Sequence, residues 1–156
     1  MLLIKSQRDM LLSPLLSVSG IVEKRHTLPI LSNVLLEKTG DRLTFLATDI
    51  EIQITTVTNG TIGENDGAVT VSAKKLQDIL RLLPENSEVS LSLDEKRLLI
   101  RTEKSRFSLQ TLPESDFPRM AISENNSKKI TVTQKQFRHL LGQTQFAISV
   151  DRKSVV

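Results

Sequence analysis

Asp49 and Glu51 are spaced so that they could share a divalent metal ion. On a β-strand, residues two apart point to the same face, and carboxylate oxygens are the ligands that such ions prefer. Nucleases build metal sites from carboxylate pairs of this kind. Asp49 also lies where a turn favours an Asp side chain that bonds to its own backbone. The pair leaves two interpretations open, a metal-dependent nuclease and an ordinary turn.

Other catalytic signatures are missing from the sequence. It contains no cysteine, no phosphate-binding G-x-x-x-x-G-K-[ST] or G-x-G-x-x-G segment, and no H-E-x-x-H or G-x-S-x-G motif. The two histidines, His26 and His139, lie far apart in the chain, and His139 falls on the polar side of a predicted helix. We expect both to be solvated. The sequence thus predicts a protein that is not an enzyme and that holds no cofactor or metal.

Basic residues are placed where a helix would favour acidic ones. Ser72 is a good N-cap for a helix that starts at residue 73, yet the first turn carries Lys74 and Lys75. Cations at the positive end of a helix dipole cost roughly 0.3–1 kcal/mol each at a surface. An external anion, either a phosphate or a carboxylate of a partner, would offset this cost. The alternative is that the lysines only keep the helix solvated.

The phosphate backbone of duplex DNA is the anion that the pattern favours. The net charge is +3, and basic residues recur around the other predicted helices, with Lys24 and Arg25 after the first and Lys135 and Arg138 in the third. Five dispersed phenylalanines, with no tryptophan or tyrosine, supply no stacking platform for single strands or RNA. We therefore expect weak, salt-sensitive binding to duplex DNA without sequence preference.

The elements that would position these residues follow a pattern that occurs three times. Alternating stretches at 2–6, 68–72 and 129–133 predict strands, and apolar residues at helical spacing follow each one. The three helical sets are Leu11/Pro14/Leu15/Val18, Leu76/Ile79/Leu80/Leu83 and Phe137/Leu140/Leu141. Each set predicts an amphipathic helix whose apolar side is buried. Recurrence in a fixed order indicates internal duplication.

The strands that follow the first two helices match as well. Residues 33–38 and 88–94 predict one strand in each copy, and turn formers separate it from a second strand at 42–45 and 97–100. A third strand is predicted from the alignment of Ile50, Ile52 and Ile54 with Ser105, Phe107 and Leu109. The chain is therefore predicted to be an α+β protein with duplicated β-α-β-β-β units.

The duplication also bears on the carboxylate pair. In the second copy, Lys104 and Arg106 occupy the positions of Asp49 and Glu51, so the duplicate carries the opposite charge. A metal site that both units had inherited would need acidic residues in both. The alignment therefore favours the turn interpretation of Asp49 over the nuclease interpretation.

The repeat sets the expected domain boundaries. Residues 113–127 are punctuated by prolines and then become polar, which predicts a linker, and the remaining residues are too few to complete a third unit. We expect a first domain at 1–125 and the start of a second at 126–156, as the N-terminal portion of a longer protein. No apolar run is long enough to span a membrane, and the N-terminus becomes polar too soon for a secretory signal. We expect a cytoplasmic protein.

Several motifs together resemble one known family. They are TLPILSN at 27–33, TDIE at 48–51, SRFSL at 105–109, LP at 112–113 and DFP at 116–118. With the duplication, they resemble the bacterial replicative sliding clamp, the β subunit of DNA polymerase III. The resemblance implies a DNA-clamp fold, with helices on one face of antiparallel sheets. In that family, three such domains per subunit and two subunits form a homodimeric ring around duplex DNA, with the helices lining the hole.

The resemblance also implies roles for individual residues. Arg25 matches a family arginine in a loop that touches DNA, and Arg81 matches a basic residue on the lining helix. The face that the first domain offers to the third domain of a neighbouring subunit would consist of Lys75, Ile79, Arg97, Lys104, Arg106, Phe107 and Leu109. Phe107 and Leu109 alternate with Arg106 on a predicted edge strand, which suits pairing with an acidic, apolar edge. The alternative is that Phe107 and Leu109 are ordinary core residues.

The chain departs from the family pattern near its end. Where the family continues with an Arg-Tyr-x-Leu-Asn-Gly strand, residues 150–156 read VDRKSVV. We therefore expect this chain to lack the cleft that binds the polymerase and the clamp loader in the family. The function predicted is that of a processivity factor that encircles duplex DNA, with Lys24, Arg25, Lys74, Arg81, Lys135 and Arg138 as DNA-binding residues. The alternatives are the nuclease that uses Asp49 and Glu51, and a protein-only adapter that caps an intact clamp.

Overall fold

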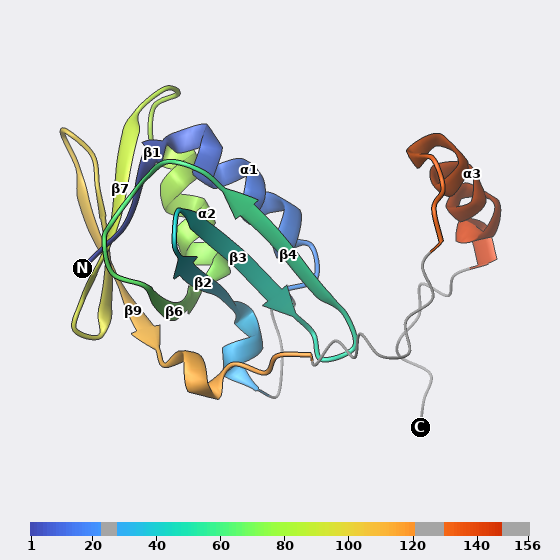
Figure 1. The fold of residues 1–156 in the computed structure, drawn as a ribbon, viewed down its shortest axis with the longest axis horizontal. Coiled ribbons are helices and arrows are strands. Elements are labelled where there is room, and N and C mark those ends of the chain that lie inside the picture. Colours follow the sequence, from blue (N-terminus) through green and yellow to red (C-terminus); the bar gives the residue numbers. More distant parts are fainter. Residues whose placement is uncertain (23–27, 121–129, 148–156) are drawn as a thin grey trace. The chain divides into compact units, whose positions relative to one another are not determined.

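The computed structural model describes residues 1–22, 28–120 and 130–147 (Figure 1). The chain divides into two compact units, Met1–Met120 and Ala121–Val156, and each is described by itself. Unit 1 contains all the strands of the described residues, and unit 2 contains one α-helix with a short 3₁₀ turn after it. The candidate interfaces described below lie mainly in unit 1.

Unit 1 is built from nine antiparallel strands and two α-helices among the described residues. The strands are β1 (Leu2–Gln7), β2 (Asn33–Thr39), β3 (Arg42–Thr48), β4 (Gln53–Thr58), β5 (Thr61–Ile62), β6 (Gly67–Ser72), β7 (Glu88–Asp94), β8 (Arg97–Arg101) and β9 (Arg106–Leu112). The helices are α1 (Arg8–Ser19) and α2 (Ala73–Leu82), with 3₁₀ turns η1 (Pro29–Ser32) and η2 (Glu114–Asp116). The strand order is β4-β3-β2-β6-β9-β8-β7-β1-β5.

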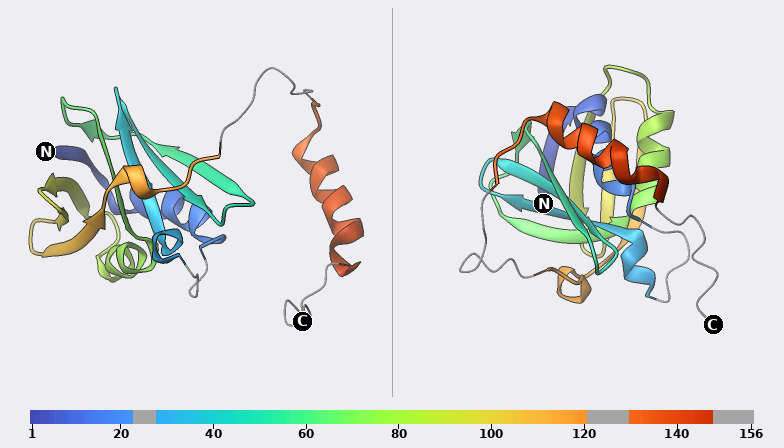
Figure 2. Two further views of the ribbon diagram at one scale, coloured as in Figure 1. Left: turned by 90° about the horizontal axis from the view of Figure 1, so that it is seen from below. Right: turned by 90° about the vertical axis from the view of Figure 1, so that its right-hand side faces the viewer.

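This order confirms the predicted duplication. One copy runs β1-α1-β2-β3-β4 and the other β6-α2-β7-β8-β9, and both helices cover the same face of the curled sheet (Figures 1 and 2). The two-residue strand β5 was not predicted, and it pairs with β1 at the far edge. Because α1 and α2 pack against each other, the two copies share one core rather than forming separate halves.

That core is made almost entirely of aliphatic side chains. Leu11, Leu15 and Val18 of α1 and Leu76 and Leu80 of α2 are fully buried against inward-facing strand residues. Burying each side chain of this kind contributes about 2 kcal/mol relative to leaving it in water. The helical spacing recognised in the sequence is therefore the spacing that joins the helices to the sheet.

Helix α1 contains a proline, and a neighbouring strand supplies the hydrogen bond that this proline removes from the helix. Pro14 has no N–H, so the carbonyl of Met10 loses the donor it would have within the helix. The hydroxyl of Thr58, at the end of β4, donates to this carbonyl at 2.6 Å. One turn further on, the hydroxyl of Thr56 donates to the carbonyl of Pro14 at 3.1 Å. Strand β4 is thus bonded to α1 through two hydroxyl groups, besides the apolar contact of Ile54 with the core.

Helix α2 begins as the sequence predicted. The hydroxyl of Ser72 accepts from the backbone N–H of Lys75 at 3.4 Å, and the first turn contains no acidic residue. Leu76 and Leu80 face the core, whereas Leu82 is 79% exposed. The helix ends at Leu82, just before Leu83-Pro84, as expected for a residue that precedes proline.

The turns of unit 1 correct one strand prediction. Ile50 and Ile52 do not belong to the third strand, because β4 starts only at Gln53. Thr48 to Ile52 instead form a turn in which Ile50 has a φ of 81°. A β-branched side chain rarely adopts this conformation, so the turn is strained. Alternating apolar residues therefore predicted the strand a few residues too early.

Residues 113–120 are not the free linker that the sequence predicted. Phe117 is 4% exposed and packs with Leu35 and Leu46 on the face of the sheet opposite the helices. The guanidinium of Arg119 bonds to both carboxylate oxygens of Glu37, at 3.0 and 3.3 Å through one nitrogen. We call residues 113–120 the strap. The rest of the predicted linker, residues 121–127, lies outside the described residues.

Unit 2 confirms a helix and contradicts a strand. Helix α3 (Gln134–Thr144) carries a capping box between Thr133 and Gln136. Residues 130–133, the described part of the predicted 129–133 strand, pair with no strand among the described residues. Phe137, Leu140 and Leu141 are each more than half exposed, so the apolar side that we expected to be buried is open in the described residues. The division proposed at residue 125 stays a prediction.

Candidate nucleic-acid and subunit interfaces

The cations of α2 lie on its solvent side. Lys74 and Arg81 are both exposed, on the side of the helix opposite its buried leucines. The ammonium of Lys74 pairs with the carboxylate of Asp78 at 3.4 Å, four residues further along the helix. This exposed pair offsets part of the dipole cost, because such pairs contribute only a few tenths of a kcal/mol. Lys75 and Arg81 have no acidic partner among the ion pairs of the described residues.

A shallow groove runs beside these cations. It has a volume of about 520 Å³ and lies between the end of α1 and the exposed side of α2. Its lining residues are Ser19, Val22, Ser32, Ser72, Ala73, Lys74, Gln77, Asp78 and Arg81. The groove combines hydroxyl groups with two cations, which are the groups that proteins use to contact phosphate oxygens.

The remaining predicted DNA-binding residues are not brought to this groove by the described residues. Lys24 and Arg25 lie outside the described part of the chain. Lys135 and Arg138 are exposed on α3 in unit 2. The proposed DNA contacts of these four residues remain predictions from the sequence and from the family resemblance.

Strand β9 was predicted to be an edge strand, and this is wrong for its C-terminal end. Its last two residues pair with β6, through Thr70 with Leu112 and Val71 with Thr111. Its first five residues pair only with β8, because β6 turns away into α2. The segment Arg106–Gln110 therefore has one open side among the described residues.

The register shows which backbone groups face that open side. The N–H of Thr111 donates to the carbonyl of Lys96, and the N–H of Thr102 donates to the carbonyl of Ser105. In an antiparallel pair the bonded positions alternate, so the odd-numbered residues bond to β8. Arg106, Ser108 and Gln110 consequently direct their N–H and C=O groups away from β8. They form a short template for another strand.

The apolar residues of the predicted subunit interface are only partly buried. Phe107, Leu109 and Ile79 pack against the main core, so each has a structural role. None of the three is fully enclosed. The four predicted cations of this surface, Lys75, Arg97, Lys104 and Arg106, are all exposed. The seven residues therefore lie on α2, on β8, on β9 and in the turn before β9.

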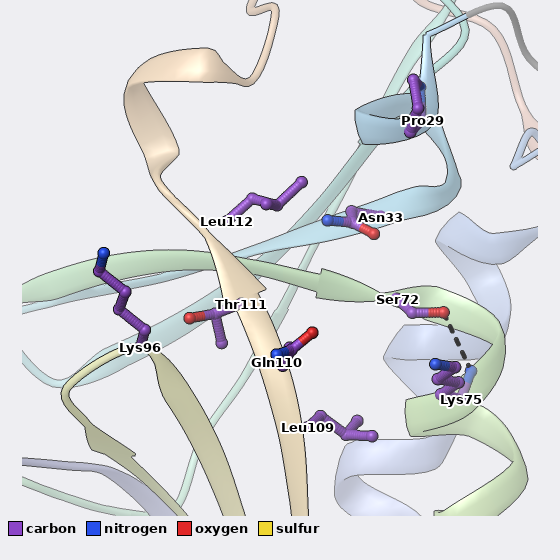
Figure 3. Close-up of a pocket in the computed structure, with 9 residues that line it drawn as sticks. All are labelled: Pro29, Asn33, Ser72, Lys75, Lys96, Leu109, Gln110, Thr111 and Leu112. Atoms are coloured by element: carbon purple, nitrogen blue, oxygen red, sulfur yellow. Dashed lines mark hydrogen bonds between the residues drawn. The ribbon is translucent and has the colours of Figure 1, made fainter.

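A pocket of about 410 Å³ marks the place where β6 and β9 diverge (Figure 3). Ser72 and Lys75 line it from the start of α2, and Leu109 and Gln110 line it from β9. Lys96 contributes a second ammonium from the turn between β7 and β8. We call this space the fork pocket. Sequence reasoning missed this pocket because the β6–β9 pairing could not be foreseen.

Asp49 and Glu51 do not form the metal site that we considered. The carboxylate of Asp49 accepts from the backbone N–H groups of Glu51 and Ile52, at 3.0 and 2.7 Å. This is the turn arrangement that the sequence also suggested. In addition, no group of three or more metal-binding side chains occurs in the described portion of the chain. The geometry thus gives no support to the nuclease interpretation.

One ion pair was missed entirely by sequence reasoning. The side chain of Lys38 is completely buried, and its ammonium bonds to the carboxylate of Asp66 at 3.0 Å. The same carboxylate oxygen accepts from the N–H of Gly40 at 2.9 Å. The hydrogen bond from Lys38, followed by that from Gly40, lowers the pKa of Asp66 below its usual value of 3.8. Asp66 thereby joins the β2–β3 turn to the chain that leads into β6.

A repeated β-α-β-β-β unit, one antiparallel sheet and two helices on the same face define the DNA-clamp class of α+β proteins. The chain matches the family described as "DNA polymerase III beta subunit, N-terminal domain" over residues 2–121. It belongs to this family, the bacterial sliding clamps. The family consists of non-catalytic processivity factors, which agrees with the prediction that the chain is not an enzyme.

Individual relatives support the assignment. The beta sliding clamp of Pseudomonas putida KT2440 is 40% identical over 144 residues, which are 92% of this chain and 39% of that protein. The beta sliding clamp of Caulobacter vibrioides NA1000 is 42% identical over 147 residues, with coverages of 93% and 39%. The crystal structure of the DNA polymerase III subunit beta from Pseudomonas aeruginosa superposes with a TM-score of 0.88 at 36% identity, covering 98% of this chain and 41% of that one.

The chain spans about two fifths of the length of these relatives, as their coverages show. Within the described residues, no helix has both the length and the apolar character needed to cross a bilayer.

Proposed function

We propose that this chain contributes the first domain of a sliding clamp and acts in DNA replication as part of a processivity factor. The observation that carries the proposal is the placement of α1 and α2 on one face of the sheet, with Lys74 and Arg81 exposed on the outer side of α2. Membership of the clamp family supports it. In this proposal the helical face lies toward duplex DNA, and the opposite face of the sheet, which the strap crosses, lies outward.

The mechanism is tethering rather than recognition. Lys74 and Arg81, together with Lys24, Arg25, Lys135 and Arg138, contact phosphate oxygens, which carry no sequence information. Each contact is weak, so the protein holds no fixed position along the duplex and slides. A ring that encloses the DNA then prevents dissociation, and the polymerase bound to the ring remains on its template.

The second proposed surface is the subunit interface. The open segment Arg106–Gln110 of β9 offers backbone groups to a strand of another clamp subunit, and Phe107 and Leu109 offer apolar area beside it. Exposed cations on both sides, Lys75 and Lys104 among them, favour an acidic partner. The polymerase and the clamp loader are the further partners that this proposal implies for the full-length subunit.

The DNA-binding proposal is tested by reversing charge on α2. Residues 1–120 of this chain replace the corresponding segment of the Pseudomonas putida clamp, and retention on circular DNA is measured at increasing salt. We expect Lys74→Glu with Arg81→Glu to lower retention. The binding constant K falls as salt is added, and the loss of two phosphate contacts should make the plot of log K against log salt concentration less steep by about 2.

The matched control reverses two exposed charges on strands instead. Lys5→Glu with Arg42→Glu changes the net charge equally but leaves α2 intact. Equal retention by the α2 variant and the unmodified chimera would contradict the proposal. A protein-only adapter would use the β9 surface without the α2 cations, so that same result, together with intact subunit binding, would favour the adapter.

A further inference from the structure

The exposed side of α2 carries an acidic residue between two of its cations. Lys74, Asp78 and Arg81 follow one another at helical spacing, so they form a single stripe along the helix. All three line the groove of about 520 Å³ beside the end of α1. At 1.5 Å per residue the stripe is about 10 Å long, with Asp78 near its middle. A phosphate in this groove therefore meets a cation, an anion and a second cation.

The two cations of the stripe have different partners. The ammonium of Lys74 lies 3.4 Å from a carboxylate oxygen of Asp78, and the two side chains are 68% and 52% exposed. The guanidinium of Arg81 is held by a neutral group instead. In the amide orientation that satisfies both side chains, the oxygen of Gln77 accepts from two guanidinium nitrogens at 2.7 and 3.2 Å. Arg81 thus keeps its full charge in the groove, whereas Asp78 neutralises the charge of Lys74.

Helix stability does not account for the order of the charged pair. An acidic residue at position 74 and a basic one at position 78 would suit both the helix dipole and the preferred orientation of pairs four residues apart. The chain has the reverse order, with lysine in the first turn. Because the pair is exposed and in its weaker orientation, the ammonium of Lys74 can exchange the carboxylate for a phosphate with little loss of free energy.

We propose that Asp78 limits the affinity of the groove for DNA by competing with phosphate for Lys74. This inference rests on the proposed function, and it adds a residue whose role is to weaken binding. A phosphate that approaches Lys74 must displace the carboxylate, and the carboxylate displaces the phosphate again. Contacts at this end of α2 are therefore released easily, which favours sliding over binding at a fixed position. Asp78 acts through Lys74 and is a positioning residue.

Neutralising Asp78 tests the proposal. The chimera that carries residues 1–120 of this chain is followed as it diffuses on stretched duplex DNA, and its retention on circular DNA is measured at increasing salt. We expect Asp78→Asn to slow diffusion and to increase retention by about two- to fivefold at low salt, the range that one exposed ion pair supplies. The plot of log K against log salt concentration should become steeper by up to about 1, because Lys74 then makes a full phosphate contact. Unchanged diffusion and retention would overturn the proposal.

Two matched variants separate this role from a general effect of charge. Asp41→Asn removes a carboxylate that is 95% exposed in the turn between β2 and β3, and it should leave both measurements unchanged. Asp78→Glu keeps a carboxylate four residues from Lys74 and should behave like the unmodified chimera. Equal effects of Asp41→Asn and Asp78→Asn, or equal effects of Asp78→Glu and Asp78→Asn, would contradict the proposal. Circular dichroism with thermal unfolding reports whether each variant keeps its fold.

Removing Lys74 shows whether Asp78 acts through it. In a Lys74→Gln background there is no ammonium for which carboxylate and phosphate compete. Asp78→Asn should then increase retention by a smaller factor than it does when Lys74 is present. An equal gain in both backgrounds would show that Asp78 acts on the phosphates directly, and the role assigned to the pair would be wrong.

Failure of this inference can be distinguished from failure of the proposed function. If Lys74→Glu with Arg81→Glu leaves retention unchanged, then α2 does not contact DNA and both proposals are wrong. If that charge reversal lowers retention but Asp78→Asn does not raise it, then only the role of Asp78 is wrong.

Discussion

Lys38 and Asp66 show how one buried side chain can depend on one exposed partner. Removing the charge of Asp66 leaves the ammonium of Lys38 buried without a counterion, which is costly inside a protein. We expect Asp66→Asn to lower the free energy of unfolding measured by urea titration at neutral pH. In contrast, Lys38→Met removes the buried charge itself, so Lys38→Met with Asp66→Asn should be more stable than Asp66→Asn alone.

The same pair predicts a dependence on pH. The pKa of Asp66 in the folded protein lies below its usual value of 3.8, so the carboxylate contributes stability above that value. This contribution is lost as the pH falls through the lowered pKa, because protonation then removes the charge. The stability of the unmodified chain relative to Lys38→Met with Asp66→Asn should therefore be constant at higher pH and should fall as the pH drops below 3.8. A constant difference would show that the pair does not titrate as described.

Sequence patterns identified some residues better than others. Ser72 and Asp49 were predicted because each bonds to backbone groups only two or three residues away. Burial of Lys38 was not predicted, since its partner lies 28 residues further along the chain. It points to the same side of β2 as Val34 and Leu36, which belong to the main core. Local spacing cannot show that a distant loop will supply a carboxylate there.

At the scale of elements, β4 and α1 form a coupled pair. Thr58 donates to the carbonyl that Pro14 leaves without a helical partner. We expect Thr58→Val to lower the free energy of unfolding by about 1–2 kcal/mol, because it leaves a carbonyl unsatisfied. In a Pro14→Ala background the helix supplies its own N–H, and the same substitution should cost about 1 kcal/mol less. Equal costs in the two backgrounds, measured by urea unfolding, would contradict this coupling.

The strap makes a second prediction at this scale. Phe117 covers Leu35 and Leu46 on the face opposite the helices, so Phe117→Ala should lower the free energy of unfolding by about 3 kcal/mol. Arg119→Ala is the matched control, because it removes an exposed ion pair of the same segment and should cost less than about 1 kcal/mol. If both variants unfold at the same urea concentration as the unmodified chain, then the strap does not stabilise unit 1.

Elements within one repeat could be predicted, whereas contacts between distant segments could not. Helices α1, α2 and α3 could be predicted from the spacing of their apolar residues, which is a local property of the chain. The strap was mistaken for a linker because its prolines and polar residues are typical of linkers. Only the apolar patch around Leu35, brought together by β2 and β3, explains why Phe117 is buried there.

For the whole molecule, the duplication was visible in the sequence but its strand order was not. Repetition of β-α-β-β-β predicted two similar halves, and the structure contains them. Strands β6 and β9 are neighbours within the sheet, and their pairing joins β4-β3-β2-β6 to β9-β8-β7-β1-β5. On β9 this pairing is confined to the last two residues. That short contact creates the open β9 segment and the fork pocket, so the candidate subunit surface depended on a feature that no local pattern contains.

The pairing of β1 with β7 has a consequence for how the protein is made. Strand β1 leaves the ribosome before the other strands of unit 1, but its longer neighbour in the sheet, β7, begins only at Glu88, and its other neighbour, β5, has only two residues. At roughly 5–20 residues per second, the apolar residues of β1 and α1 wait about 5–15 s before that neighbour exists. Strands β2, β3 and β4, by contrast, emerge in succession and can pair at once. The N-terminal segment is therefore the part of the nascent chain that most needs protection by chaperones during synthesis.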